Sequence, residues 1–149
     1  MAKLQKSILI NAPVDKVYAF MNDPHHLPEI WPSMIEVKDV TPAAGGGFNF
    51  GWVYKMAGIH FDGASETVEY VLNQRTVTKS TKGIESKFTW TYEAVKDGTK
   101  LTVDVEYTVP IPVLGKLAEA VIVKQNEREA ETLLENLKQR MEIETPIAA

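Results

Sequence analysis

Cysteine is absent from the 149 residues, so the chain cannot form a disulfide, a thiolate nucleophile or a thiolate metal site. No apolar run approaches the length of about 18 residues that a membrane-spanning helix needs, and no apolar stretch follows a basic start as in a signal peptide. Basic residues do not gather in one block, and the formal net charge of −4 argues against a nucleic-acid binder. These absences favour a cytoplasmic protein.

Motifs that carry catalysis or cofactor binding are also missing. The sequence has no Ser-His-Asp order, no HExxH pair, no glycine-rich phosphate loop and no EF-hand spacing. The adjacent His25 and His26 would point apart on a short helix or loop, which argues against a joint metal site. We therefore expect neither a metal nor a cofactor.

Short alternating segments fill most of the chain up to residue 109. Apolar and polar residues alternate in many of them, and turn signals such as Asp97-Gly98 separate them, as in an antiparallel meander. Asn11 is expected to cap the first of two short helices, which ends near residues 22–24, and the second lies within residues 25–31. Strands are expected at residues 3–10, 34–40, 48–56, 59–72, 76–81, 84–93 and 101–109.

One long helix is expected at residues 112–143, because strong helix formers dominate there and no proline occurs from residue 114 to 141. It would span roughly 45 Å against a small-domain diameter of about 30 Å, so it must cross the domain, overhang it or bend. Polar residues 124–128 separate two apolar stripes on different sides of this helix. Either both halves pack within one core, or the first half covers a cavity and the second half anchors the helix.

These elements predict an α+β fold in a single domain of residues 1–149. An antiparallel meander has one solvent-exposed face and one buried face, and the buried face needs a second layer of structure to pack against. Only the C-terminal helix is long enough to supply that layer. We therefore expect a curved antiparallel sheet of about seven strands around a long C-terminal helix, with two short helices after the first strand.

Large rings occur on one face of two expected strands. Phe48, Phe50, Trp52 and Tyr54 share one face of residues 48–56, and residues 84–93 carry a similar set. The rings either fill the gap between sheet and helix or line an apolar cavity with polar tips, as in a small-molecule pocket.

The order and spacing of several short segments give the chain a family resemblance. The segments are 11–18 (NAPVDKVY), 27–32 (LPEIWP), 88–93 (FTWTYE), 97–101 (DGTKL), 114–117 (LGKL) and 135–138 (ENLK). Together they resemble the START-like superfamily (SRPBCC), in its polyketide cyclase/dehydrase and lipid-transport branch. The resemblance covers nearly the whole chain. It implies a helix-grip fold with a hydrophobic cavity between the sheet and the long helix, but it does not imply one function.

With this cavity in mind, the candidate ligand-binding residues are the inward rings and their apolar neighbours. They are Trp31, Phe48, Phe50, Trp52, Tyr54, Met56, Phe88, Trp90, Tyr92, Tyr107, Leu117 and Val121. His60 and Glu66 are weak candidates for acid/base catalysis, because they alternate onto one face of residues 59–72. The sequence leaves open which face of that strand points inward, and Thr67 and Glu69 are the alternatives if it is the other face. The triple glycine within residues 43–47 suits a mobile rim of the cavity.

Three functions fit these patterns. The first is binding or transport of a small hydrophobic molecule, such as a lipid, a quinone or a polyketide-like compound. The second is a polyketide cyclase/aromatase or dehydratase that uses an acid/base residue in the same cavity. The third is a structural or interaction protein with a closed core. A small hydrophobic ligand is the expected partner, and the chain is expected to be a monomer or a homodimer.

Overall fold

The computed structural model describes residues 1–110 and 115–144 of the chain. Its elements follow the expected order, with a short 3-10 helix, η1, between the two short helices. The bounds are β1 Ala2–Ile10, α1 Val14–Asn22, η1 Pro24–His26, α2 Leu27–Ile30, β2 Met34–Pro42, β3 Phe48–Met56, β4 Ile59–Val71, β5 Arg75–Lys82, β6 Ser86–Val95, β7 Gly98–Tyr107 and α3 Lys116–Glu144.

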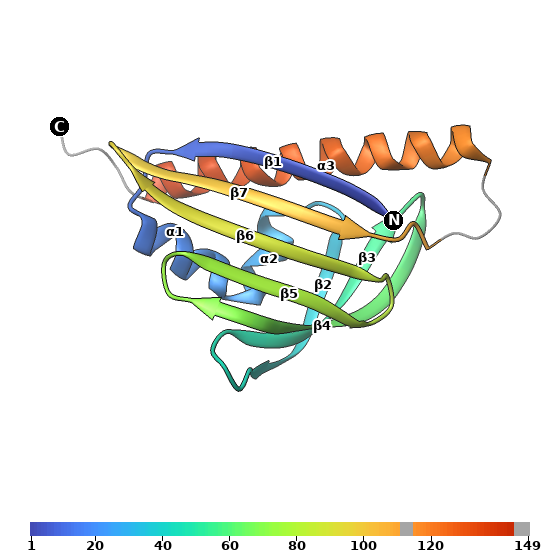
Figure 1. The fold of residues 1–149 in the computed structure, drawn as a ribbon, viewed down its shortest axis with the longest axis horizontal. Helices are drawn as coiled ribbons and strands as arrows, with labels where there is room; N and C mark the ends of the chain where they lie inside the picture. The colour runs from blue at the N-terminus through green and yellow to red at the C-terminus, as the bar shows by residue number, and fades with distance from the viewer. Residues whose placement is uncertain (111–114, 145–149) are drawn as a thin grey trace.

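The seven strands form one antiparallel sheet in the order β1-β7-β6-β5-β4-β3-β2. β1 and β7 pair along their length, from Ala2 opposite Tyr107 to Ile10 opposite Thr99. Alternate residues of β7 are buried, because successive side chains of a strand point to opposite faces. The sheet curves strongly, and α3 runs along its inner side (Figure 1). The predicted α+β class is therefore confirmed.

The C-terminal half of α3 anchors the helix in the core. Leu134, Leu137 and Met141 are almost completely buried and share one helix face. Polar contacts hold the same end: Lys138 Nζ donates to the backbone oxygen of Leu9 at 3.0 Å. Burial of three large apolar side chains makes this half the main contribution of α3 to stability.

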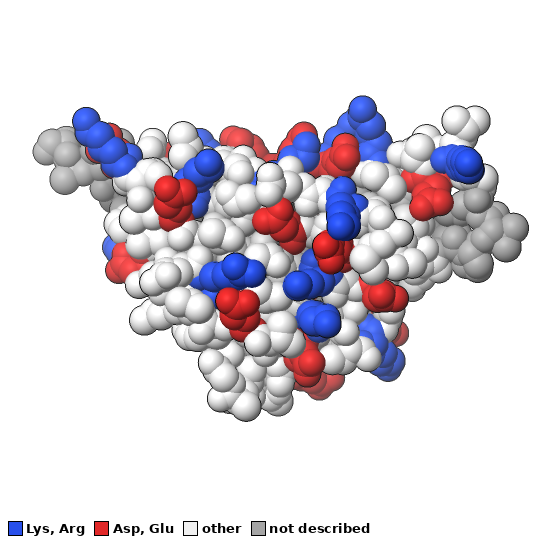
Figure 2. Space-filling view, viewed as in Figure 1, with Lys and Arg blue, Asp and Glu red and all other residues white. Residues whose placement is uncertain are grey.

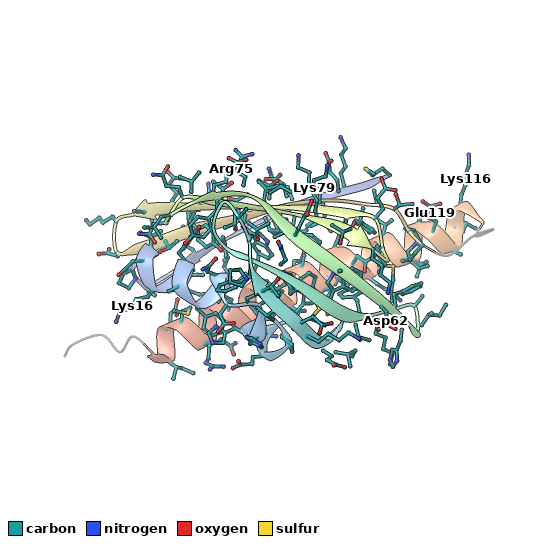
Figure 3. All side chains as sticks on the ribbon, turned by 90° about the horizontal axis from the view of Figure 1, so that it is seen from below. Lys16, Asp62, Arg75, Lys79, Lys116 and Glu119 are labelled. Atoms are coloured by element: carbon teal, nitrogen blue, oxygen red, sulfur yellow. The ribbon has the colours of Figure 1, made fainter. Side chains whose placement is uncertain are left out.

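The N-terminal end of α3 extends past the sheet (Figure 1). Leu117 is 86% exposed and Val121 is 57% exposed, whereas Ile122 is the first buried residue of the helix. Lys116 and Glu119 also project from this end (Figure 3). The helix thus takes the overhanging alternative, because it is longer than the sheet that it crosses. The expected helical residues 112–114 lie outside the described residues.

The pairing of β4 with β5 has two irregularities, and the second one changes which residues of β4 face inward. The register shifts between Ala64 and Ser65, and again between Thr67 and Glu69. Before the second shift the odd-numbered residues face inward, and after it Tyr70 does. A bulge of this kind moves the following side chains to the other face of the sheet.

The segment after β1 differs from the expectation in its helix cap. Pro13, not Asn11, is the N-cap of α1. The backbone N–H of Asn11 instead donates to Glu142 Oε2 of α3 at 3.0 Å. In η1, the side chain of Asp23 caps the helix by accepting from the His25 backbone at 3.0 Å.

The outer face of the sheet is charged but of mixed sign. Acidic and basic side chains alternate over the face turned to the viewer in Figure 2. Arg75 and Lys79 point outward from β5, away from α3 (Figure 3). Within residues 1–110 and 115–144, no helix has the length and apolar character needed to cross a bilayer.

Candidate functional site

A cavity of about 140 Å³ lies between the inner face of the sheet, α3 and the α1–α2 segment. All seven strands contribute to its wall, from Leu4 of β1 to Tyr107 of β7. Most of the residues proposed from the sequence lie in this wall. These are Trp31, Phe48, Phe50, Trp52, Tyr54, Met56, Phe88, Trp90, Tyr92 and Tyr107.

The rings of the wall hold one another in place. Trp31 meets Tyr54 and Phe88 edge-on, with ring centroids 5.5 and 5.4 Å apart. Phe88 and Trp90 are stacked at 6.2 Å. Such contacts add to the free energy of burial and fix the orientation of each ring. The wall is therefore preorganised along β3 and β6 and at Trp31.

Two of the proposed ligand-binding residues lie away from the cavity. Leu117 and Val121 are on the overhanging part of α3, where their side chains are exposed. The expectation that the first half of α3 covers the cavity is therefore wrong for the described residues 116–121. The helical wheel gave their common face correctly, but it could not show where along the helix the sheet begins.

His60 and Glu66 are also outside the cavity. Both are exposed on β4, whereas Ser65 and Thr67 of the same strand line the cavity. Strand alternation puts neighbouring residues on opposite faces, so an inward Ser65 requires an outward Glu66. The structure thus removes His60 and Glu66 as acid/base candidates.

Hydroxyl side chains line the part of the wall formed by β4, β5 and β6, and apart from Thr67 the sequence reasoning missed them. Several already have partners: Trp52 Nε1 donates to Ser65 Oγ at 2.9 Å, and Thr67 Oγ1 donates to the backbone oxygen of Phe48 at 2.7 Å. The hydroxyl residues of the wall are Ser65, Thr67, Thr76, Thr78 and Ser86. Knowledge of the inward face of β4 would have identified the first two.

The middle of α3 supplies the opposite wall. Asn126, Glu129, Ala130 and Leu133 line the cavity, and their spacing of three and four residues places them on one helix face. Sequence reasoning did not assign them to the cavity, because it treated Asn126 as part of the polar break at residues 124–128 and placed Ala130 and Leu133 in the second apolar stripe, which anchors the helix. The spacing of three and four residues continues from Asn126 to Leu133, and this periodicity was the signal that could have identified them as one face.

Glu129 is the only side chain with a formal charge among the described residues of the wall. Its Oε1 accepts a hydrogen bond from the backbone N–H of Ser33 at 2.7 Å. One turn earlier, Asn126 Nδ2 donates to Tyr107 Oη at 3.0 Å. A carboxylate, an amide and a phenol therefore occur together in a wall that is otherwise mainly apolar.

The tyrosines of the wall keep their protons at neutral pH. Burial raises the pKa of Tyr54 to about 12, and the Glu129 carboxylate acts in the same direction. Burial also raises the pKa of Tyr107 and of Tyr92. Their hydroxyls are therefore available as hydrogen-bond donors across the physiological range. Within the described residues, no group of three or more His, Cys, Asp or Glu is placed to hold a metal ion.

A sequence model of one family matches most of the chain. The family is described as Polyketide cyclase / dehydrase and lipid transport, and the match spans residues 1–142. No curated protein matches the chain in sequence.

Solved structures with the same fold are numerous but distant in sequence. TTHA0849 from Thermus thermophilus is 22% identical, with a TM-score of 0.85 over 97% of this chain and 100% of that one. A START superfamily protein from Mycobacterium smegmatis is 17% identical, with a TM-score of 0.78 over 94% and 97%. The Zhui aromatase/cyclase from Streptomyces sp. R1128 is 14% identical, with a TM-score of 0.79 over 99% and 98%. At these identities the similarity shows a START-like fold, as expected.

Proposed function

The chain belongs to the polyketide cyclase/dehydrase and lipid transport family, and from that premise we propose that it binds or carries a small hydrophobic ligand in the cavity under α3. The observation that supports this proposal is the wall of aromatic rings around the cavity between the sheet and α3. Trp31, Tyr54 and Phe88 are held by contacts with one another and still border the cavity. Concave, mainly apolar sites with a few polar groups are typical of small-molecule binding.

The size of the cavity indicates which ligands enter without rearrangement. Its volume of about 140 Å³ is close to the roughly 150 Å³ of an apolar cavity that holds benzene. Drug-sized ligands occupy pockets of about 300–1,000 Å³. A single ring with a short substituent therefore fits the space as it stands. A lipid, a quinone with a long tail or a polyketide chain would require α3 or the rings to move.

Catalysis by a cyclase or dehydratase mechanism is the second candidate function. One observation favours it: the Glu129 carboxylate is held at the cavity wall by the Ser33 backbone N–H. A carboxylate fixed beside a bound substrate can act as a general base. In this alternative Glu129 takes the acid/base role that the sequence suggested for His60 and Glu66.

Two variants of α3 test whether the cavity is the binding site. Ala130→Phe places a ring in the cavity, whereas Ala120→Phe places the same ring on the exposed end of the helix. A hydrophobic fluorescent dye is titrated against both variants and the unmodified protein. We expect Ala130→Phe to weaken dye binding at least about tenfold, and Ala120→Phe to leave it unchanged.

Native mass spectrometry of the protein purified from cells provides an independent measurement. A bound apolar compound that is lost in Ala130→Phe but kept in Ala120→Phe would support the carrier. An unmodified protein that carries no such mass, and that also fails to bind the dye, would instead favour the closed core of a structural or interaction protein.

A further inference from the structure

Polar groups of the cavity gather where the ends of β3 and β7 approach the middle of α3. The two strands are separated by β4, β5 and β6 in the sheet, so only its curvature brings them to one place. Asn126 of α3 contacts both: its Nδ2 lies 3.0 Å from Tyr107 Oη and 4.0 Å from Met56 Sδ. Glu129 follows on the same helix face, one turn further along.

Glu129 provides a hydrogen-bond acceptor at this place. Its Oε1 accepts from the Ser33 backbone at 2.7 Å, which fixes the side chain against the segment after α2. A carboxylate has about four lone-pair positions on two oxygens, so this contact leaves acceptor capacity. Among the described residues, no lysine or arginine forms an ion pair with Glu129. An apolar ligand would cover this carboxylate without replacing its lost water, which is costly.

Tyr107 provides a hydrogen-bond donor. Because Asn126 Nδ2 has no acceptor role, the Tyr107 oxygen must accept in their contact, and its own O–H remains free to donate elsewhere. Tyr54 is a second donor nearby. Burial, the Glu129 charge and Tyr107 all act on its hydroxyl, which stays protonated.

Trp31 adds a buried donor to the same part of the wall. Its ring meets that of Tyr54, and its indole N–H acts to lower the pKa of the Tyr54 hydroxyl. That N–H is nevertheless buried without a partner of hydrogen-bond geometry among the described residues. Native proteins leave few buried polar groups unpaired. A polar atom of a ligand that reaches this N–H from the cavity would satisfy it.

We propose that the cavity selects a small ring compound with a hydroxyl group, such as a phenol. The Glu129 carboxylate accepts a hydrogen bond from the hydroxyl of the ligand, and the Tyr107 hydroxyl donates one to the ligand oxygen. A hydroxyl is at once donor and acceptor, so it satisfies both sides of the site, and the ring then lies among the aromatic residues. This inference rests on the proposed function, because it specifies which ligand the cavity takes.

Three single-ring probes of similar size test the proposal. They are p-cresol, which has a hydroxyl, 4-methylanisole, which has an acceptor but no donor, and toluene, which has neither. Dissociation constants are measured by NMR titration of the protein. We expect p-cresol to bind about tenfold more tightly than toluene, because hydrogen bonds to charged groups are among the stronger ones. 4-Methylanisole should bind no better than toluene, since it cannot donate to Glu129.

Variants then assign the preference to the named groups. Glu129→Gln and Tyr107→Phe keep the shape of each side chain and should each reduce the p-cresol preference to about threefold or less, with toluene affinity unchanged. Glu135→Gln, on an exposed position of the same helix, should keep the full preference. Melting curves show whether each variant is folded. If one variant does not fold, the preference of the unmodified protein for p-cresol over toluene still tests the proposal.

The outcomes separate this inference from the proposed function. Toluene that binds as tightly as p-cresol would overturn the hydroxyl site and leave the cavity proposal standing. A hydroxyl preference that survives both Glu129→Gln and Tyr107→Phe would also overturn the assignment to these groups. If none of the three probes binds and the dye does not bind either, the proposed function itself fails.

Discussion

The indole ring of Trp52 lies against the backbone of Gly63, its partner in the β3–β4 ladder. A Cβ atom at Gly63 would sit 2.2 Å from Trp52 Cζ2 and 2.7 Å from the backbone oxygen of Lys82. Real Cβ contacts are essentially never this short. The absence of a side chain at Gly63 is therefore what allows Trp52 to lie in the cavity wall with its Nε1 on Ser65.

Gly63→Ala should consequently destabilise the protein and disturb the cavity together. The added methyl group must displace either the Trp52 ring or the β5 backbone, and overpacking of this kind costs about 1–3 kcal/mol. Thermal melts and dye titrations measure the two effects. Gly45→Ala is the matched control, because a Cβ at Gly45 meets no atom within 4 Å. Equal melting temperatures for the two variants would show that Trp52 does not need this space.

The fold could be predicted from the sequence because its signals are local and agree with one another. Alternation specified β7, and the Asp97-Gly98 turn specified its connection to β6, since each depends on neighbouring residues only. The face of β4 could not be predicted in the same way. Its bulge near Val68 depends on how β5 pairs with β4, and no residue type in the strand predicts such a bulge.

The candidate site was predictable on the sheet but not on α3. Rings at alternate positions of β3 and β6 had to share a face, so their place in one wall followed once the inner face was known. On α3 the face was predictable but the position along the axis was not. Leu117 and Val121 lie beyond the sheet, while Asn126 and Glu129 lie over the cavity, because helix length and sheet width are set by different parts of the chain.

The overhang of α3 predicts a sharp contrast between its two ends. Leu137→Ala removes a side chain with no exposed surface and should lower the free energy of unfolding by about 2–5 kcal/mol. Leu117→Ala makes the same chemical change at an 86% exposed position and should alter it by less than about 0.5 kcal/mol. Urea denaturation of both variants measures the difference. Similar losses would mean that the end of α3 near Leu117 is packed in solution.

Removal of the outward groups of β4 should leave ligand binding unchanged. His60 and Glu66 are exposed and do not line the cavity. The double variant His60→Ala with Glu66→Ala should therefore bind the hydrophobic dye within about twofold of the unmodified protein, since it touches neither the wall nor its partners. Fluorescence titration measures this affinity, with Trp90→Ala as the variant that should lose it. A marked loss of dye affinity in the double variant would show that His60 or Glu66 takes part in ligand binding.

Glu142 should make the stability of the protein depend on acid pH. Its carboxylate accepts from the Asn11 backbone N–H and pairs with Lys138, and these contacts lower the pKa of Glu142 in the folded state. A lowered pKa means that the contribution is fully present above the ordinary value of about 4.3 and disappears as the pH falls through the lower, folded-state value. For a partly exposed pair we expect at most about 1 kcal/mol.

The comparison of Glu142→Gln with the unmodified protein isolates this contribution. Urea denaturation between about pH 7 and about pH 2.5 measures the free energy of unfolding of both proteins. The variant should be less stable at neutral pH, and the difference in free energy should shrink toward zero in the acid range. It shrinks because a protonated Glu142 no longer carries the charge that the variant lacks. Glu135→Gln removes a carboxylate from an exposed position of the same helix and should show no such convergence. If Glu142→Gln lowers the free energy of unfolding by the same amount at both ends of the pH range, the contact between Asn11 and α3 does not depend on the charge of Glu142.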